Sequence, residues 1–325
     1  MSAPSRTAAR VSVLLPVYNR AASVGASLDS VLSQDPAPFE VIVIDDGSTD
    51  DLAAALAPFE GRVRAHRQPN AGVAAARNAG ARLARGDWLA FQDSDDLWAP
   101  DHMATVTRDL AGAGTDVVCH LGDVVYTGDG YRRSLMDMKG RAFPEERAAR
   151  VERPFDLVMS GMTLQAAAVR RDAFHRVGGF DEGMRMLSDT AFFCLLALEG
   201  PFLATGREVA EIRRLPGDEA AITSLRRKDA LYARQMHVRY LEAVPTVRLD
   251  AAERRAHGAA LSGAILHRAE AEAAAGQGAA ARASLRAAAR RHPSAARGWI
   301  KSALALTLGA RGHRMLAGSG GLDRS

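Results

Sequence analysis

The stretch FQDSDDLWAP (91–100) places three carboxylates, Asp93, Asp95 and Asp96, directly after the apolar segment WLAF. Like charges this close repel each other, so a strand end rarely carries them without a compensating partner. Hard oxygen ligands suit Mg²⁺ or Mn²⁺, which commonly bridge a few carboxylates and substrate phosphates. The same residues are also compatible with a solvated acidic turn that caps a helix beginning near Pro100. The loop is therefore a candidate metal site.

Two further polar clusters follow apolar runs nearer the start of the chain. The run VSVLLPV (11–17) leads into Tyr18, whose ring can either stack on a nucleobase or pack at a sheet edge. The run FEVIVIDD (39–46) ends at Asp46, whose carboxylate can accept a base imino proton or a ribose hydroxyl. Residues 48–51 favour an N-cap turn for the next helix, so we expect Asp46 to be the group left over for a ligand.

The helical pattern GVAAARNAGARLARG (72–86) carries Arg77 early in its length. A helix start with an arginine nearby favours a bound phosphate, although a salt bridge to one of the many acids explains the same residue. Other kinds of site are disfavoured. The first apolar run is not followed by GxGxxG, the chain has no GxxxxGK[ST], and it has no closely spaced His and Cys set typical of zinc.

The first hundred residues alternate strand and helix patterns. The predicted elements are strands at 11–17, 39–46, 62–68 and 87–93 and helices at 21–34, 48–59 and 72–86. This alternation predicts right-handed crossovers and a mainly parallel sheet that is covered on both faces. Because ligands bind outside the carboxyl ends of such strands, the three polar clusters should meet at one edge of the sheet.

The pattern changes after residue 100 and again near residue 220. The next predicted elements are strands at 116–120, 123–128 and 163–171 and a helix at 188–200. The last predicted elements are helices at 222–243, 251–275, 278–291 and 294–310. We therefore predict an α/β domain at 1–220, an α-helical region at 221–317 and a disordered tail at 318–325.

The bulk composition is that of a globular protein in water, with 47% apolar and 25% charged residues. Cys119 and Cys194 both lie in apolar contexts, so we expect buried reduced thiols rather than a disulfide, which fits a reducing, cytoplasmic compartment. No segment approaches the ~18 continuous apolar residues of a membrane span.

Positive charge concentrates in the last part of the chain. From residue 250 onward there are 12 Lys and Arg against 5 Asp and Glu, a net +7 that leaves −3 for the remainder. A basic helical region can meet an acidic membrane surface or nucleic acid, or it can form a solvated face. Nucleic acid is disfavoured because the cations are not interleaved with aromatics. The segment 297–316, with Trp299 and flanking cations, favours either an interfacial membrane helix or a packed core helix.

Four stretches together resemble the family 2 glycosyltransferases of the GT-A fold: VSVLLPVYNR, VIVIDDGSTD, PNAGVAAARNAGARLARGDWLAFQDSDD and VGGFDE. The resemblance covers about residues 11 to 215. It implies a nucleotide-sugar-binding domain with a central, mainly parallel mixed sheet, a nucleotide-sugar donor with UDP favoured, Mg²⁺ or Mn²⁺, and inversion at the anomeric carbon. By position, Asp95 would bind the metal that neutralises the diphosphate. The implied donor contacts are Pro16, Tyr18, Asn19, Asp46, Gly72, Arg77 and Asp93.

The catalytic base of the family lies after GGFDE, in an acid-Asp-aromatic triplet that opens a helix. Asp189, in LSDT (187–190), occupies that position in this sequence. The resemblance implies that it deprotonates the acceptor hydroxyl, whereas the residues alone are equally compatible with a helix cap. Ser188 and Thr190 stand where an acid and an aromatic are usual, and this departure concerns acceptor recognition more than catalysis.

The leading hypothesis is an inverting, metal-dependent glycosyltransferase that moves a sugar to a glycan or lipid-linked acceptor in cell-surface polysaccharide synthesis. The intact acids favour this enzyme. The alternative is a non-catalytic nucleotide-sugar-binding protein whose helical tail is an interaction module. Leu215, where the family often has a histidine, keeps that alternative open, unless Arg213 or Arg214 compensates by holding metal or diphosphate.

Overall fold

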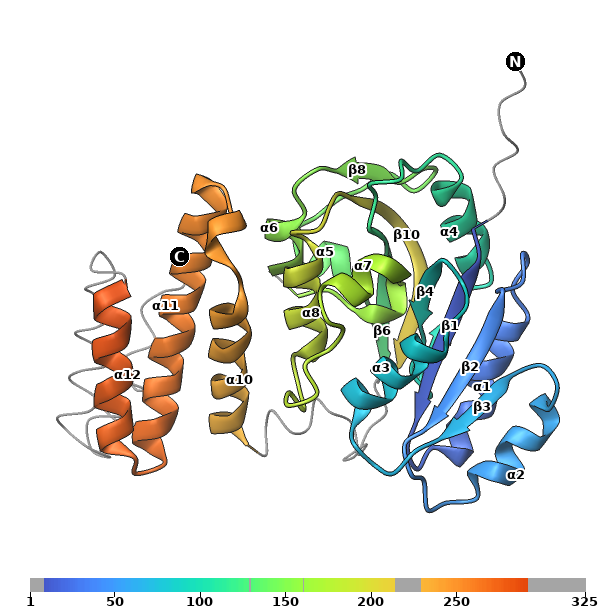
Figure 1. Cartoon of the computed structure of the whole chain (residues 1–325), viewed down its shortest axis with the longest axis horizontal. Helices are drawn as coiled ribbons and strands as arrows, with labels where there is room; N and C mark the ends of the chain where they lie inside the picture. Colours follow the sequence, from blue (N-terminus) through green and yellow to red (C-terminus); the bar gives the residue numbers. More distant parts are fainter. Residues whose placement is uncertain (1–8, 129, 160, 214–228, 292–325) are drawn as a thin grey trace. The chain divides into compact units, whose positions relative to one another are not determined.

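The computed structural model describes residues 9–128, 130–159, 161–213 and 229–291 (Figure 1). The chain divides into two compact units, residues 1–218 and 219–325. The first unit is built on a mixed β-sheet with helices packed against it, and the second unit contains only helices among its described residues.

The first half of unit 1 alternates strands and helices as the sequence pattern predicts. Its elements are β1 Val11–Val17, α1 Ala21–Leu32, β2 Glu40–Asp45, α2 Leu52–Leu56, η1 Ala57–Phe59, β3 Arg64–Arg67, α3 Val73–Leu83, β4 Trp88–Phe91, β5 Leu97–Trp98 and α4 His102–Leu110. Most of these elements lie within a few residues of the predicted bounds. The helix predicted at 48–59 is the exception, because it breaks into the short α2 and the 3₁₀ turn η1 around Pro58.

The second half of unit 1 has a different pattern. Its elements are β6 Cys119–Gly128, β7 Tyr131–Ser134, α5 Leu135–Met138, β8 Ala149–Val151, α6 Phe155–Met159, η2 Leu164–Ala166, β9 Ala167–Arg170, α7 Arg171–Arg176, α8 Ser188–Leu196 and β10 Phe202–Arg213. The two strands predicted at 116–120 and 123–128 were wrong as separate elements. They form the single strand β6, which pairs with β10 on both sides of a register shift, and the missing Cβ of Gly122 leaves room for Val209 at that point.

The sheet has ten strands, with the path β3-β2-β1-β4-β9-β6-β10-β5, while β7 pairs with β6 and β8 with β10. β1 to β4 are parallel to one another, and β6 and β10 are parallel to each other. β9 joins the two groups and runs antiparallel to both β4 and β6. The sheet is therefore the mixed one that the GT-A resemblance implies.

Burial explains why the central strands are continuous apolar runs. Every residue of β1 and β4 is buried, since helices cover both faces of the sheet. Right-handed crossovers place α1 and α2 on one face and α3 on the other, because the chain moves outward through β1-β2-β3 and then back to β4. α3 packs closely because Gly80 stands over Ile44, where a Cβ atom would lie 2.7 Å from Cδ1.

Unit 2 consists, in its described residues, of α10 Ala230–Ala243, the turn η3 Thr246–Arg248, α11 Ala251–Ala274 and α12 Gly278–Arg291. α11 begins with a capping box between Asp250 and Glu253. The helices predicted at 251–275 and 278–291 are confirmed, whereas the segments 294–310 and 318–325 lie outside the described residues. None of the helices within the described ranges combines the length and hydropathy that a membrane crossing requires.

Both cysteines are free and buried, which confirms the prediction of unpaired thiols. Burial raises the pKa of Cys194 to about 12 and raises the pKa of Cys119 as well. Both thiols therefore stay protonated at neutral pH and behave as small apolar side chains.

Two glycines with the same backbone dihedral provide a test of the loop after β2. Gly47 and Gly61 both have φ +77°, but a Cβ on Gly47 would lie 2.8 Å from the backbone nitrogen of Asn70, whereas nothing lies within 4 Å of one on Gly61. Gly61→Ala should lower the free energy of unfolding by about 1–2 kcal/mol through backbone strain alone. Gly47→Ala should cost about 1–3 kcal/mol more, because the 68–72 loop must shift. Chemical denaturation measures both, and equal losses would contradict the close approach.

Candidate active site

The three polar clusters meet at one edge of the sheet, because β1 lies between β2 and β4 and all three strands are parallel. Hydrogen bonds join the clusters directly. The Oδ1 atom of Asn19 accepts from the backbone N–H of Thr49 at 2.7 Å, and the N–H of Asn19 donates to Oγ of Ser48 at 3.0 Å. Asn19 has φ +52°, a conformation that asparagine tolerates better than most residues. Its amide oxygen thus ties the end of β1 to the end of β2.

Asp46 is not the spare carboxylate that the sequence predicts. Its Oδ1 accepts from Nε2 of Gln68 at 2.7 Å and from the N–H of Ala71 at 2.9 Å, and its Oδ2 accepts from the N–H of Gly72 at 2.8 Å. The prediction failed because the 68–72 loop folds back over the end of β2, which no local pattern reports. About one of the four acceptor positions of the carboxylate remains for a ligand.

Tyr18 and Pro16 lie differently although both follow from the same motif. Tyr18 is 49% exposed, among the most exposed large apolar side chains of the described residues, so one ring face is accessible for stacking. Pro16 is buried within β1 and pairs with Ile44 in the ladder. The structure thus leaves about half of the Tyr18 side chain exposed, whereas Pro16 is covered within the sheet.

Arg77 and Asp93 form an ion pair that joins α3 to the end of β4. Nη2 of Arg77 lies 2.6 Å from Oδ1 of Asp93, and the arginine side chain is only 7% exposed. Its Nε is buried with no hydrogen-bond partner among the described residues. Buried polar groups are rarely left unsatisfied, so this N–H is available to an incoming acceptor. Both expected readings of Arg77, an ion pair and a contact to an anion, are therefore compatible with its position.

The sequence analysis missed two side chains near this pair, of which Gln165 contacts it directly. Gln165 of η2 donates from Nε2 to Oδ2 of Asp93 at 2.6 Å and to Oδ2 of Asp96 at 2.9 Å. Asn78 of α3 donates from Nδ2 to the carbonyl oxygen of Phe180 at 2.9 Å and accepts from the Phe180 N–H at 2.9 Å. No local sequence pattern indicates either role, because each residue forms its hydrogen bond with a partner more than 60 positions away.

Asp95 and Asp93 are the partly exposed carboxylates of the acidic loop, at 32% and 29%. The Asp95 side chain lies 3.5 Å from Nη2 of Arg20, while Asp96 is buried. Arg213, at the end of β10, donates from Nε to the carbonyl oxygen of Asp95 and from its N–H to Oδ1 of Asp96. Arg213 thus contacts the acidic loop, and its compensation for Leu215 stays a prediction; Arg214 and Leu215 lie outside the described residues.

The donor set at Asp95 fits a metal that arrives with phosphates. No group of three or more His, Cys, Asp or Glu in the described ranges could enclose an ion alone. Mg²⁺ and ions like it commonly bind through one or two carboxylates, with waters and substrate phosphates completing the shell. A partly exposed carboxylate such as Asp95 at a strand end suits that arrangement better than a resident, fully caged metal.

Asp189 is the second residue of α8, and the helix begins directly after Leu187, which has φ +60°. Its Oδ1 accepts the backbone N–H of Thr190 at 2.8 Å. Burial raises the pKa of Asp189; the hydrogen bond from Thr190 and the charge of Arg77 oppose the rise, while the charge of Asp93 adds to it. The carboxylate therefore sits within electrostatic reach of the ion pair at the end of β4, and its raised pKa is a property of groups that accept protons.

Aromatic packing fixes α8 against this edge. The ring of Phe180 lies 5.7 Å from that of Phe91 in β4 and 4.7 Å from that of Phe192 in α8. These centroid separations are typical of interacting aromatic pairs. Phe192 is three residues after Asp189, so the cluster sets the position of the helix turn that carries the carboxylate.

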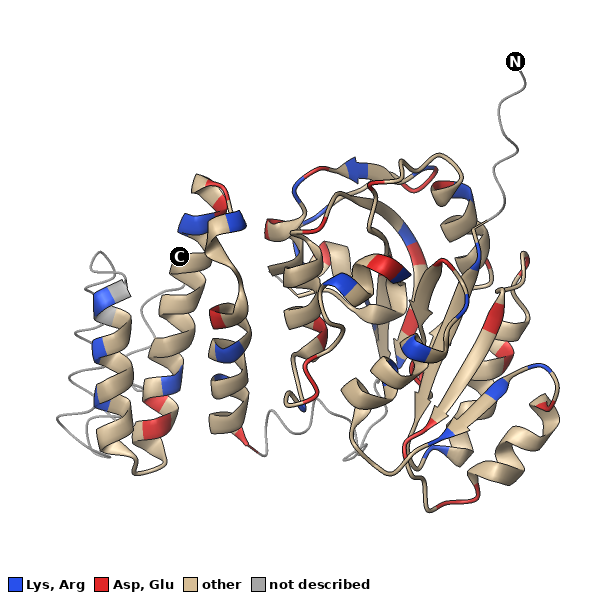
Figure 2. Ribbon diagram, in the orientation of Figure 1, with Lys and Arg blue, Asp and Glu red and all other residues tan. Residues whose placement is uncertain are grey.

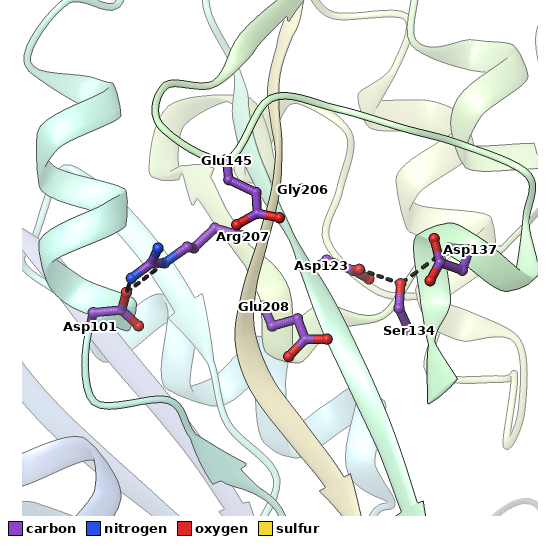
Figure 3. Close-up of a pocket in the computed structure, with 8 residues that line it drawn as sticks. All are labelled: Asp101, Asp123, Ser134, Asp137, Glu145, Gly206, Arg207 and Glu208. Carbon is purple, nitrogen blue, oxygen red and sulfur yellow. Dashed lines mark hydrogen bonds and ion pairs between the residues drawn. The ribbon is translucent and has the colours of Figure 1, made fainter. Parts of the chain in front are cut away.

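A cavity of about 500 Å³ lies elsewhere in unit 1, along β6 and β10 (Figure 3). Its lining residues are Asp101, Asp123, Ser134, Asp137, Glu145, Gly206, Arg207 and Glu208. Arg207 pairs with Asp101, Ser134 donates to Asp123, and burial raises the pKa of Asp123. None of these residues belongs to the predicted site. A lining of five carboxylates and one arginine repels a diphosphate, so the strand edge remains the candidate donor site.

Comparison with curated proteins finds glycosyltransferases. The chain is 28% identical over 193 residues to an uncharacterized glycosyltransferase of Haemophilus influenzae, covering 59% of this chain and 63% of that protein. It is 34% identical over 186 residues to a PGL/p-HBAD biosynthesis glycosyltransferase of Mycobacterium bovis, covering 56% of this chain and 67% of that protein. A Rickettsia felis glycosyltransferase matches over only 16% of its length. The chain thus spans less than two thirds of several of these relatives.

Solved structures share the fold. The S. aureus TarS 1-349 fragment in complex with UDP-GlcNAc has a TM-score of 0.64 at 15% identity, covering 92% of both chains. The Pyrobaculum calidifontis mannosyltransferase PcManGT, in complex with GDP-Man and Mn²⁺, has a TM-score of 0.53 at 21% identity, covering 96% of this chain and 84% of that chain. At these identities the likeness concerns the fold, which is the GT-A fold that the motifs imply.

The family assignment follows from the sequence that forms the strand edge. The model of the family described as Glycosyl transferase family 2 matches residues 12–178, about half of the chain. The matched range includes β1, β2, α3 and β4 with the polar loops described above. The chain therefore belongs to glycosyl transferase family 2.

Proposed function

We propose that the protein is an inverting, metal-dependent glycosyltransferase. It moves a sugar from a nucleotide-sugar donor, preferably a UDP-sugar, to a glycan or lipid-linked acceptor in cell-surface polysaccharide synthesis. The observation that carries the proposal is the Arg77–Asp93 ion pair at the end of β4. The charges of both residues act on the pKa of Asp189. The proposed donor residues and the proposed base would then act at one edge of the sheet.

The donor would lie across the ends of β1, β2 and β4. Tyr18 offers a ring face to the base, and Asp46 keeps about one acceptor position for it. Asp93, held by Arg77 and Gln165, would contact the sugar end of the donor. The choice of UDP is supported by the complex of TarS with UDP-GlcNAc, while PcManGT with GDP-Man makes GDP the main rival.

Asp189 would accept the proton of the attacking acceptor hydroxyl. The acceptor oxygen forms a bond to the anomeric carbon as the bond from that carbon to the diphosphate oxygen breaks, and attack from the opposite face inverts the configuration. The raised pKa of Asp189 makes the carboxylate a better base than an ordinary aspartate. A divalent ion at Asp95, when bound, supplies positive charge that offsets the charge of the leaving diphosphate.

The metal assignment predicts the behaviour of Asp95→Ala. The purified protein should bind and slowly hydrolyse a UDP-sugar in the presence of Mn²⁺, and EDTA should remove that binding. Asp95→Ala should remove the Mn²⁺-dependent part while the fold is retained, because the Asp95 side chain is 32% exposed and its ion pair with Arg20 is also partly exposed. Calorimetric titration with UDP, with and without EDTA, measures the effect.

Asp29→Ala is the matched control, since Asp29 is an exposed carboxylate of α1. Its nucleotide affinity should equal that of the parent. Binding by the parent that is insensitive to EDTA would exclude the metal role of Asp95, and binding without any transfer or hydrolysis would favour a non-catalytic nucleotide-sugar-binding protein.

The base assignment predicts the behaviour of Asp189→Asn. Donor binding should persist, and transfer should fall by roughly 10²-fold or more, the usual range for the loss of a general base. In the parent the rate should fall as the pH falls through the pKa of Asp189, because only the ionised carboxylate accepts the proton. Burial raises that pKa, so the acid limb should lie above the ordinary aspartate value of about 3.9.

The pH–rate profile of the variant should lose this limb. Asp172→Asn is the control, since Asp172 is an exposed carboxylate in the first turn of α7. Near-normal transfer by Asp189→Asn, with the acid limb intact, would show that another group takes the proton.

The proposal places the enzyme in the cytoplasm, at the inner face of the membrane that presents a lipid-linked acceptor. α12 carries arginines and no acids, and Arg282, Arg286 and Arg290 are exposed on it (Figure 2). The basic segment 297–316 lies outside the described residues and extends this charge. Basic helical segments bind anionic lipid surfaces.

Vesicle sedimentation tests the membrane contact. The protein should co-sediment with vesicles that contain phosphatidylserine, less so at high salt, and not with neutral phosphatidylcholine vesicles. Deletion after residue 293 removes the cations of 297–316 but keeps α12, so it should weaken vesicle binding without loss of UDP binding. Absence of binding at low salt would show that recruitment to the membrane depends on a partner.

A further inference from the structure

Gln165 bridges two carboxylates of the loop that follows β4. Its Nε2 donates to Oδ2 of Asp93 at 2.6 Å and to Oδ2 of Asp96 at 2.9 Å. The two oxygens therefore lie no more than 5.5 Å apart, the sum of the two hydrogen-bond lengths. Ionised carboxylates at this separation repel each other, and the amide is the donor that both of them share.

Chemistry fixes which end of the amide faces the loop. The two partners are carboxylates, which accept hydrogen bonds when ionised, so the NH₂ group and not the oxygen of Gln165 must point toward them. Each N–H then serves one carboxylate. No other neutral side chain of this length offers two donors from a single atom, which makes the residue type specific to the task.

The direction of β9 explains why Gln165 lies beside the 93–96 loop. η2 immediately precedes β9, and β9 runs antiparallel to β4, with Ala168 opposite Ala90. The start of β9 therefore lies at the edge where β4 ends. Leu164 and Ala166 are buried on either side of Gln165, so the backbone that carries the amide is held by packing.

Each carboxylate also has a second anchor. Oδ1 of Asp93 accepts from Nη2 of Arg77 at 2.6 Å, and Oδ1 of Asp96 accepts from the N–H of Arg213 at 3.1 Å. Loss of the Gln165 donors would leave both anchors in place but would remove the tie between them. The repulsion would then act on the separation of the two carboxylates, and so on the loop between them.

We propose that Gln165 is a positioning residue of the donor site. It holds Asp93 and Asp96 at a fixed separation and thereby sets the shape of the 93–96 loop, which presents Asp95 toward the diphosphate. The inference rests on the proposed function, since it gives the loop a nucleotide to bind. Its signature is a change in nucleotide affinity that a loss of fold stability alone would not produce.

Two variants and one control separate an effect on nucleotide affinity from an effect on fold stability. Gln165→Met removes both donors and keeps an unbranched side chain of similar length. Gln165→Glu keeps the shape but replaces the donor NH₂ with a third acceptor. Gln34→Met is the control, because Gln34 is also a buried amide, with Nε2 donating to the carbonyl oxygens of Ser30 and Ala99 at 2.9 and 2.8 Å.

The experiment uses the full chain and titrates UDP in the presence of Mn²⁺ by calorimetry, alongside thermal unfolding and the electron paramagnetic resonance spectrum of bound Mn²⁺. All three variants should unfold at lower temperature. Only the Gln165 variants should bind UDP more weakly, by roughly tenfold or more, the effect of losing hydrogen bonds to charged groups. Their Mn²⁺ spectrum should also differ from that of the parent, whereas Gln34→Met should match it.

Parent-like UDP affinity in the Gln165 variants, with normal binding by the parent, would overturn the positioning role and leave the proposed function intact. Equal losses in the Gln165 and Gln34 variants would also overturn it, since stability would then explain the result. If the parent binds neither UDP nor another nucleotide with Mn²⁺, both proposals fall. If one Gln165 variant does not fold, the other decides.

Discussion

The ion pair between Arg77 and Asp93 is the contact on which the site depends. The guanidinium is almost fully buried, and removing one partner of a buried pair costs about 3–5 kcal/mol; here the partial exposure of Asp93 lowers that figure. The pair also has a wider electrostatic effect. The charge of Arg77 opposes the rise that burial causes in the pKa of Asp189. Without it, the carboxylates of Asp93, Asp96 and Asp189 would gather near one edge with one cation fewer.

Uncharged contacts keep that edge rigid. Phe180 packs between Phe91 and Phe192, and the Asn78 amide makes two hydrogen bonds with the backbone of Phe180. Three separate elements, β4, α3 and α8, therefore share one support. A proton acceptor works only when its distance to the reacting oxygen is held within a narrow range, so this packing matters to the chemistry as much as to stability.

Much of the fold, and part of the site, could be predicted from the sequence. The parallel strands β1 to β4 and their carboxyl edge follow from local periodicity and from the handedness of crossovers, which act over short stretches. The continuity of β6 could not be predicted in this way, because it depends on pairing with β10, some eighty positions later. The same dependence on distant residues explains why the role of Gln165 and the hydrogen bonds of the Asp46 carboxylate were not predicted. Their partners are brought together by tertiary folding, and a hydrogen bond to a distant residue leaves no periodic trace in the chain.

The antiparallel direction of β9 has a consequence for how such a site can change. Parallel strands reach the edge with their carboxyl ends, and each is followed by a connection that crosses back over the sheet. An insertion after such a strand therefore also affects the helix of that connection. β9 reaches the same edge with its beginning, and the residues before it enter from the loop side. Insertions ahead of Thr163 can therefore reshape the rim of the site without shifting any register in the sheet. Variation ahead of β9 thus gives this architecture a way to change one side of the site while the ends of β1, β2 and β4 stay the same.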